Sequence, residues 1–255
     1  MSAERASGGD LAALRTTLGA STVLWAGQER LIVEPGCWQA LSGARSVDFN
    51  VVACHDGDVA AAIARGLEVV ADAAVPAVIM VAGRALAAVQ LLVDAGWVCI
   101  GATPFMMRTA RGGTDDPCVR KLGLSELAEA RALVAPAFDL SAELSVVALP
   151  DRAGEGGAQE AWGLYEDGRM VTCVGTVTVD LSVAVWSMAT PQPLRRRGYG
   201  GRLVSAVLAR RAAEGVVRSL LYASEVGEPL YHSLGYDVLE HWQMWSRPRW
   251  VLGRA

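Results

Sequence analysis

Glycines and arginines occur together in one stretch of the sequence, Met188–Leu203, at a spacing that suits phosphate. The glycines have no side chains, so backbone N–H groups can converge on a ligand there; they are Gly198, Gly200 and Gly201. A helix predicted to begin at Tyr199 would add the positive end of its dipole. Fixed positive charge comes from Arg195, Arg196, Arg197 and Arg202. The stretch therefore predicts a pyrophosphate site.

Two common nucleotide-binding loops do not fit these residues. A Walker loop ends in Gly-Lys-Ser/Thr, whereas this chain has Gly201-Arg202-Leu203. A dinucleotide fingerprint needs a glycine at its last position, where Leu203 stands. The pattern that fits is R/Q-x-x-G-x-G/A, which reads Arg195-Arg-Arg-Gly198-Tyr-Gly200.

A second stretch lies downstream and ends in Tyr231-His-Ser-Leu-Gly235-Tyr236. With the first it covers Met188–Tyr236, and together they resemble the GNAT superfamily of N-acetyltransferases. The order of predicted elements extends the resemblance to residues 115–250. It implies an enzyme that uses acetyl-CoA as co-substrate, without a metal, and moves an acyl group directly to a primary amine. Homodimers are frequent in that family.

The elements that must position these residues form an α+β pattern. The expected fold is a mixed, mostly antiparallel sheet flanked by helices. Asp167-Gly168 is a hairpin signal between two of the strands. The sequence predicts, in order, strand 118–122, helices following Ser125 and at 142–149, a polar loop at 151–157, strands 158–166, 170–180 and 181–190, helix 199–214, strand 218–223, helix 229–234 and strand 236–247.

The resemblance also assigns roles to individual residues. Tyr231 would protonate the departing thiolate, and Ser224 would lie near the thioester. The backbone of the strand before the loop would pair with the pantetheine arm, and the loop amides would hold the pyrophosphate. The cofactor-binding residues implied are Met188, Ala189, Thr190, Arg195, Arg196, Arg197, Gly198, Tyr199, Gly200 and Gly201.

One feature departs from the family. Many members carry a glutamate base on the strand before the loop, but Ala184–Ala189 has no acidic residue. Glu225, Glu240, His241 or a bound water remain as candidates for the base. The missing glutamate also leaves room for an alternative, a non-catalytic acyl-CoA-binding or regulatory module.

The first half of the chain repeats the strand–helix–strand order of the second. We therefore expect tandem GNAT-like units, residues 1–112 and 113–255, with the turn-rich stretch Thr109–Pro117 between them. In the first unit, Cys54-His-Asp-Gly-Asp58 stands in place of the phosphate loop, and its aspartates would repel a pyrophosphate. Leu92 stands where the second unit has Tyr231. The first unit is thus expected to be degenerate and to bind no CoA.

Composition limits the kinds of partner, location and metal site that this protein can have. Of 255 residues, 52% are hydrophobic and 20% charged, enough for a packed core, and the net charge of -4 disfavours nucleic acid as a partner. No apolar run reaches the ~20 residues that a membrane span needs. With no signal peptide visible, we expect a cytoplasmic protein with a small-molecule or peptide amine as acceptor. The five cysteines and three histidines show no metal-ligand spacing.

Overall fold

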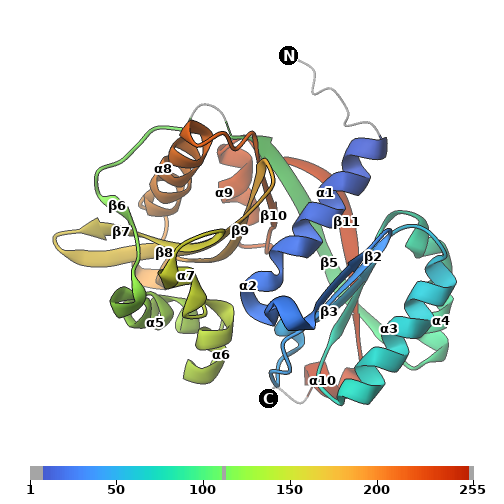
Figure 1. Cartoon of the computed structure of the whole chain (residues 1–255). Helices are drawn as coiled ribbons and strands as arrows, with labels where there is room; N and C mark the ends of the chain where they lie inside the picture. Colours follow the sequence, from blue (N-terminus) through green and yellow to red (C-terminus); the bar gives the residue numbers. More distant parts are fainter. Residues whose placement is uncertain (1–7, 111–112, 253–255) are drawn as a thin grey trace. The chain divides into compact units, whose positions relative to one another are not determined.

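The computed structural model describes residues 8–110 and 113–252, which form two compact units (Figure 1). The first unit combines the chain up to Pro104 with the chain from Leu239 onward. The second comprises Phe105–Val238. Among the described residues, no helix has the length and apolar character required to cross a membrane.

The second unit is built on a mixed sheet in the order β5-β10-β9-β8-β7-β6. Neighbouring strands are antiparallel except β9 and β10, which are parallel. The strands are β6 (Val119–Lys121), β7 (Gln159–Glu166), β8 (Arg169–Val179), β9 (Ser182–Ala189), β10 (Arg218–Tyr222) and the Phe105–Thr109 end of β5 (Val98–Thr109). The predicted α+β fold with a mostly antiparallel mixed sheet is confirmed.

Helices cover both faces of this sheet (Figure 1). Helix α8 (Tyr199–Ala213) buries Leu203 and Val207 against Val183 and Val185 of β9. The other helices are α5 (Leu127–Ala137), α6 (Ala142–Ala148), α7 (Arg152–Glu155) and α9 (Glu228–Ser233). The short helix α7 lies where only a polar loop was expected; its residues Arg152-Ala-Gly-Glu155 are too few to give a helical period.

The first unit has its own mixed sheet, in the order β1-β2-β3-β4-β11. Only β3 and β4 are parallel to each other. The strands are β1 (Leu31–Glu34), β2 (Cys37–Leu41), β3 (Asn50–Cys54), β4 (Val78–Val81) and β11 (Asp237–Ser246). The helices are α1 (Gly8–Ser21), α2 (Val23–Ala26), α3 (Val59–Ala73), α4 (Gln90–Asp94) and α10 (Pro248–Leu252). Ile63, Ile79, Leu92 and Trp97 are in its core.

The two units interleave along the chain. Strand β11, the last of the chain, pairs with β4 in the first unit (Gln243↔Val81). Residues 105–109, which follow the first unit in sequence, pair instead with β10 in the second (Tyr222↔Phe105). The division of the chain into domains 1–112 and 113–255 stays a prediction. Residues 111 and 112 lie outside the described part of the chain.

Candidate active site

A bulge distorts the end of strand β9. Cys173 of β8 pairs with Ala189, but Gly175 pairs with Trp186, so that Ser187 and Met188 stand opposite one residue of β8. Ser187 has a φ of 50°, which a bulge accommodates and a regular strand does not. Its Oγ donates a hydrogen bond to the carbonyl of Ala148 (2.7 Å), which fixes the distortion.

Strands β9 and β10 stop pairing before either strand ends. Their ladder runs from Ser182↔Arg218 to Ala184↔Leu220, whereas β9 continues to Ala189 and β10 to Tyr222. Beyond Ala184 and Leu220 no pairing between the two strands is found in the described residues, and we call this unpaired end of β9 and β10 the opening. Such edges can take up an extended chain as an added strand.

Along the chain, β9 is followed by the loop that ends at the start of helix α8. Gly198 precedes the helix with a φ of 82°, a left-handed conformation that glycine adopts without strain. The first helical hydrogen bond runs from the Arg202 N–H to the Gly198 carbonyl (3.0 Å). The amides of Tyr199, Gly200 and Gly201 therefore have no acceptor within the helix, as the first turn of any helix requires.

The arginines around this loop divide into two groups. Arg196 and Arg197 are exposed, and Arg195 donates from Nε to the Thr190 carbonyl (3.0 Å). Arg202, expected beside the phosphate, instead pairs with Asp116 (2.8 Å) and Glu166. Its guanidinium lowers the pKa of Asp116. Arg202 thus neutralises carboxylates, and the phosphate loop keeps the charges of the other three.

Close packing explains one of the glycines. A Cβ on Gly200 would lie 2.9 Å from the Met188 Cε and 3.1 Å from a Leu230 Cδ, whereas a Cβ on Gly201 would be 3.9 Å from its nearest neighbours. Glycine at position 200 therefore lets α8 approach β9 and α9 closely. This is a second reason for glycine, besides access of phosphate to the backbone.

Tyr231 lies on α9 with 6% of its surface exposed. Its ring packs edge-on against Tyr236 at 5.4 Å between centroids, and burial raises the pKa of its hydroxyl. No hydrogen bond to that hydroxyl is found among the described residues. The Tyr236 hydroxyl, by contrast, bonds to Ser219 Oγ at 2.6 Å. Burial raises the pKa of both hydroxyls, and that of Tyr231 is the one without a hydrogen-bond partner among the described residues.

The structure gives Ser224 a local role. Its side chain is exposed, and its Oγ accepts a hydrogen bond from the Gly227 amide at 3.2 Å. Its carbonyl accepts from the amides of Gly227 and Glu228, both at 2.9 Å. Ser224 thereby shapes the turn into α9, a task that is compatible with, and independent of, a place near the thioester.

The three candidate bases lie in different units. Glu225 lies in the loop before α9 and is exposed. Glu240 and His241 are on β11, in the residues that belong to the first unit. There Glu240 accepts hydrogen bonds from Arg15 (2.7 Å) and Trp242 Nε1 (2.9 Å).

The family comparison matches this part of the chain. Residues 118–239 fit the model of the acetyltransferase (GNAT) domain. These residues form a GNAT domain. A search of curated proteins found no match.

Solved structures of similar fold extend over more of the chain. A GCN5-related N-acetyltransferase from Kribbella flavida has a TM-score of 0.65 at 16% identity, covering 86% of this chain and 89% of its own. A functionally unknown conserved protein from Staphylococcus epidermidis gives 0.61 at 11%, with 85% and 93% covered. A GCN5-related N-acetyltransferase from Sphaerobacter thermophilus gives 0.55 at 19%, with 84% and 77% covered. At such low identity these likenesses concern the fold alone.

Aromatic side chains that the sequence analysis missed lie beside the opening in the GNAT domain. Tyr222 ends β10, and its ring centroid is 5.6 Å from that of Phe105 and 6.4 Å from that of Trp186. Because Val185 and Leu221 pack with α8, strand alternation puts these three rings on the opposite face. Only Trp186, in a valine-rich strand, carried a signal in the sequence. Phe105 gave none, since it comes from the other half of the chain.

The first unit has the same strand–loop–helix order but no opening. Its parallel ladder reaches the last residues of both strands, Cys54↔Val81, and continues as hydrogen bonds from Ala82 to Cys54 (3.2 Å) and from Arg84 to His55 (3.1 Å). At the start of α3 the side chain of Asp58 accepts from the Ala61 amide (3.1 Å). The start of α3 is thus capped by a carboxylate, whereas the start of α8 has no side-chain cap.

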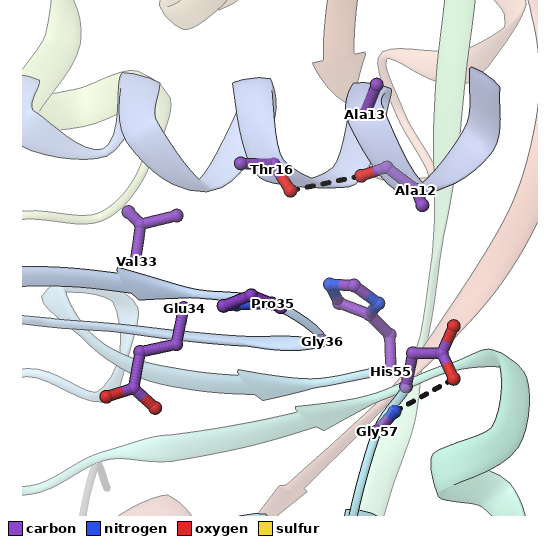
Figure 2. A pocket seen from close by; sticks show the side chains of 10 residues that line it. Ala12, Ala13, Thr16, Val33, Glu34, Pro35, Gly36, His55 and Gly57 are labelled. Atoms are coloured by element: carbon purple, nitrogen blue, oxygen red, sulfur yellow. Dashed lines mark hydrogen bonds between the residues drawn. The ribbon is translucent and has the colours of Figure 1, made fainter. Parts of the chain in front are cut away.

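A cavity of about 560 Å³ lies in the first unit (Figure 2). Helix α1, the turn after β1 and the loop after β3 line it, and the buried ring of His55 extends toward α1. Burial and the nearby Arg15 lower the pKa of His55 to about 4. The lining residues are Ala12, Ala13, Thr16, Val33, Glu34, Pro35, Gly36, His55, Asp56 and Gly57.

Proposed function

We propose that the GNAT domain transfers an acetyl group from acetyl-CoA directly to a primary amine. The family itself implies acyl transfer from acetyl-CoA. The assignment of acetyl-CoA and of direct transfer rests on two features that follow one another along the chain. These are the opening between β9 and β10 and the start of α8, where the amides of Tyr199, Gly200 and Gly201 have no acceptor within the helix. A pantetheine chain and a pyrophosphate need this sequence of an extended slot followed by converging N–H groups.

In this proposal each residue of the loop has a distinct task. The backbone of Met188–Thr190 pairs with the pantetheine arm, and Arg195 fixes the end of that segment through the Thr190 carbonyl. The amides from Arg196 to Gly201, which include those of Gly198 and Tyr199 at the helix start, hold the pyrophosphate. Arg196 and Arg197 supply exposed positive charge to it.

The chemistry requires two proton movements. An amine of pKa ~10.4 must lose a proton before attack, at a cost of ~4.6 kcal/mol at neutral pH. The amine nitrogen then attacks the thioester carbonyl, and the C–S bond breaks as the thiolate leaves. We assign protonation of this thiolate to Tyr231, whose raised pKa keeps its hydroxyl protonated. Glu225 or a bound water would take the proton of the amine, with Ser224 placed nearby.

The aromatic side chains beside the opening suit the acceptor. Trp186 and Tyr222 are partly exposed beside the buried Phe105, and the faces of aromatic rings attract cations as well as apolar groups. An acceptor with an ammonium group next to an apolar or aromatic body fits this environment. We place the acceptor on this face of the sheet, opposite α8.

We also propose that the first unit is a degenerate GNAT-like unit that binds no CoA. Its closed β3–β4 ladder and the Asp58 cap support this. The coverage of more than four fifths of the chain by GNAT structures supports a common architecture over both halves.

A steady-state assay of CoA release tests the enzymatic proposal. Acetyl-CoA is incubated with a panel of amines that includes aromatic monoamines, polyamines and peptide N-termini. Saturable, amine-dependent CoA release is the expected result. Tight acetyl-CoA binding without turnover for any amine would instead favour the alternative, a non-catalytic acyl-CoA-binding module. The absence of a glutamate from Ala184–Ala189 is the observation that favours this alternative.

A further inference from the structure

Two cysteines 17 residues apart meet on neighbouring strands of the first unit. Cys37 begins β2, Cys54 ends β3, and the two are direct partners in the antiparallel ladder. The His55 amide donates to the Gly36 carbonyl (2.8 Å), which makes Cys37↔Cys54 a non-hydrogen-bonded pair. In such pairs the side chains are closest, and here the sulfur atoms are 3.6 Å apart. Two thiols in this arrangement can be joined with little backbone movement.

The two thiols are not equivalent. Cys54 is fully buried, whereas Cys37 is partly exposed. The hydrogen bond between them lowers the pKa of Cys37 and raises that of Cys54, and the guanidinium of Arg65 adds a small lowering at Cys37. The thiolate is the reactive form of a cysteine, and of the two sulfurs the partly exposed Cys37 therefore forms it more readily.

The other cysteines lack such a partner. Cys99 contacts the Gly101 carbonyl (3.5 Å), and the buried Cys173 contacts the Ala130 carbonyl (3.5 Å). Cys118 is exposed, like Cys99. Within the described ranges no further contact between two cysteine sulfurs is found. Accessibility alone would therefore direct oxidation to Cys99 and Cys118, while geometry directs disulfide formation to Cys37 and Cys54.

We propose that Cys37 and Cys54 form an oxidation site that hydrogen peroxide converts to a disulfide between β2 and β3. The Cys37 thiolate attacks one peroxide oxygen, the O–O bond breaks, and hydroxide leaves, giving a sulfenic acid. The Cys54 sulfur then attacks the Cys37 sulfur. The S–O bond breaks, and its hydroxyl leaves as water with the proton of Cys54. In total two thiols are oxidised and one peroxide is reduced to two waters.

The disulfide would restrain two lining segments of the cavity in the first unit. Cys37 directly follows Gly36, and Cys54 directly precedes His55, both of which line the cavity. Oxidation thus couples the redox state of the surroundings to the rigidity of this site. Nothing in this step depends on the acetyltransferase activity.

The experiment uses the full chain carrying Cys99→Ser and Cys118→Ser, which removes the exposed thiols and any cross-linking between molecules. The protein is treated with hydrogen peroxide, alkylated in denaturant and digested for mass spectrometry. We expect a cross-linked peptide that joins Cys37 to Cys54, alkylation of Cys173 alone, and reversal by dithiothreitol. The thermal midpoint of the oxidised protein should rise by several degrees.

Matched variants show whether the pair acts as a unit. In the Cys54→Ser protein, Cys37 should stop at the sulfenic or sulfinic acid, with no rise of the thermal midpoint. In the Cys37→Ser protein, Cys54 should remain a thiol. Over-oxidation of Cys37 in the presence of Cys54, or two unmodified thiols after treatment, would overturn the proposal.

Discussion

Tyr231 combines a buried ring with a hydroxyl that has no partner among the described residues. If this hydroxyl protonates the thiolate, Tyr231→Phe should lower kcat about 10²-fold and leave the affinity for acetyl-CoA nearly unchanged. Steady-state kinetics with acetyl-CoA titrations checks this. The ring remains in place, so the packing on Tyr236 should survive.

Tyr236→Phe is the matched control. It also removes a buried hydroxyl, but one that bonds to Ser219 within the core. We expect a loss of about 1 kcal/mol in stability and an almost unchanged kcat. Equal losses of kcat in the two variants would mean that Tyr231 acts through packing.

His55 predicts a pH dependence of the first unit. Its pKa in the folded protein is about 4, below the ordinary value of 6.5. Between these values the unfolded chain binds a proton that the folded chain does not. The contribution of neutral His55 to the free energy of unfolding is therefore fully present above pH 6.5. It is lost as the pH falls toward 4, by at most about 3 kcal/mol. Urea unfolding of wild type and His55→Gln from pH 7 to pH 4 should show a steeper loss in wild type; parallel curves would contradict this origin.

The residue types of the loop could be predicted from sequence, because their chemistry is local. Gly198, Gly200 and the arginines before them lie at the start of α8, as the sequence predicts, and their binding of phosphate stays a prediction. The turn of Arg202 toward Asp116 and Glu166 could not be predicted. Those carboxylates are 86 and 36 residues away in sequence, and only the fold brings them there.

At the scale of elements, the approach of α8 to β9 and α9 is the sensitive contact. Gly200→Leu would place a branched side chain where Met188 and Leu230 already lie. We expect at least a ~100-fold loss of acetyl-CoA affinity by calorimetry, since a leucine side chain at the start of α8 would displace its neighbours and block the approach of the pyrophosphate to the backbone amides. Gly201→Ala, whose Cβ meets only ordinary contacts at 3.9 Å, should stay within about threefold of wild type. Wild-type affinity of a folded Gly200→Leu protein would remove the loop from the cofactor site.

Strand and helix positions in the second half agree with the sequence patterns to within a few residues. Alternating apolar residues and the Asp167-Gly168 turn specify β7 and β8 strongly. The bulge at Ser187 and the early end of the β9–β10 ladder carried no such signal. Both depend on pairing between distant strands, which periodicity within one strand does not encode.

At the scale of the whole molecule, the chain places its strands in two units that do not follow its linear order. β11 completes the sheet of the first unit, and residues 105–109 extend that of the second. A repeat of similar strands predicts that these strands exist, but the residue pattern within each strand does not show which of two similar positions it takes. This explains why the element order could be predicted and the pairing of the last strands could not.

The asymmetry between the units predicts the binding stoichiometry. One unit has an opening beside a glycine-rich helix start, and the other has a closed ladder and an aspartate cap. Calorimetry should give one acetyl-CoA per chain, with affinity that falls in Arg196→Ala/Arg197→Ala and does not change in Asp58→Asn. Two equivalents would contradict the assignment of the first unit as degenerate.

A crystal structure of the full chain with bound acetyl-CoA tests the central claim most directly. We expect one cofactor molecule, with its pyrophosphate on the amides of Tyr199–Gly201, its pantetheine between β9 and β10, and its sulfur within hydrogen-bond reach of the Tyr231 hydroxyl. Cofactor bound against the Asp58 loop of the first unit, or away from the β9–β10 opening, would contradict it.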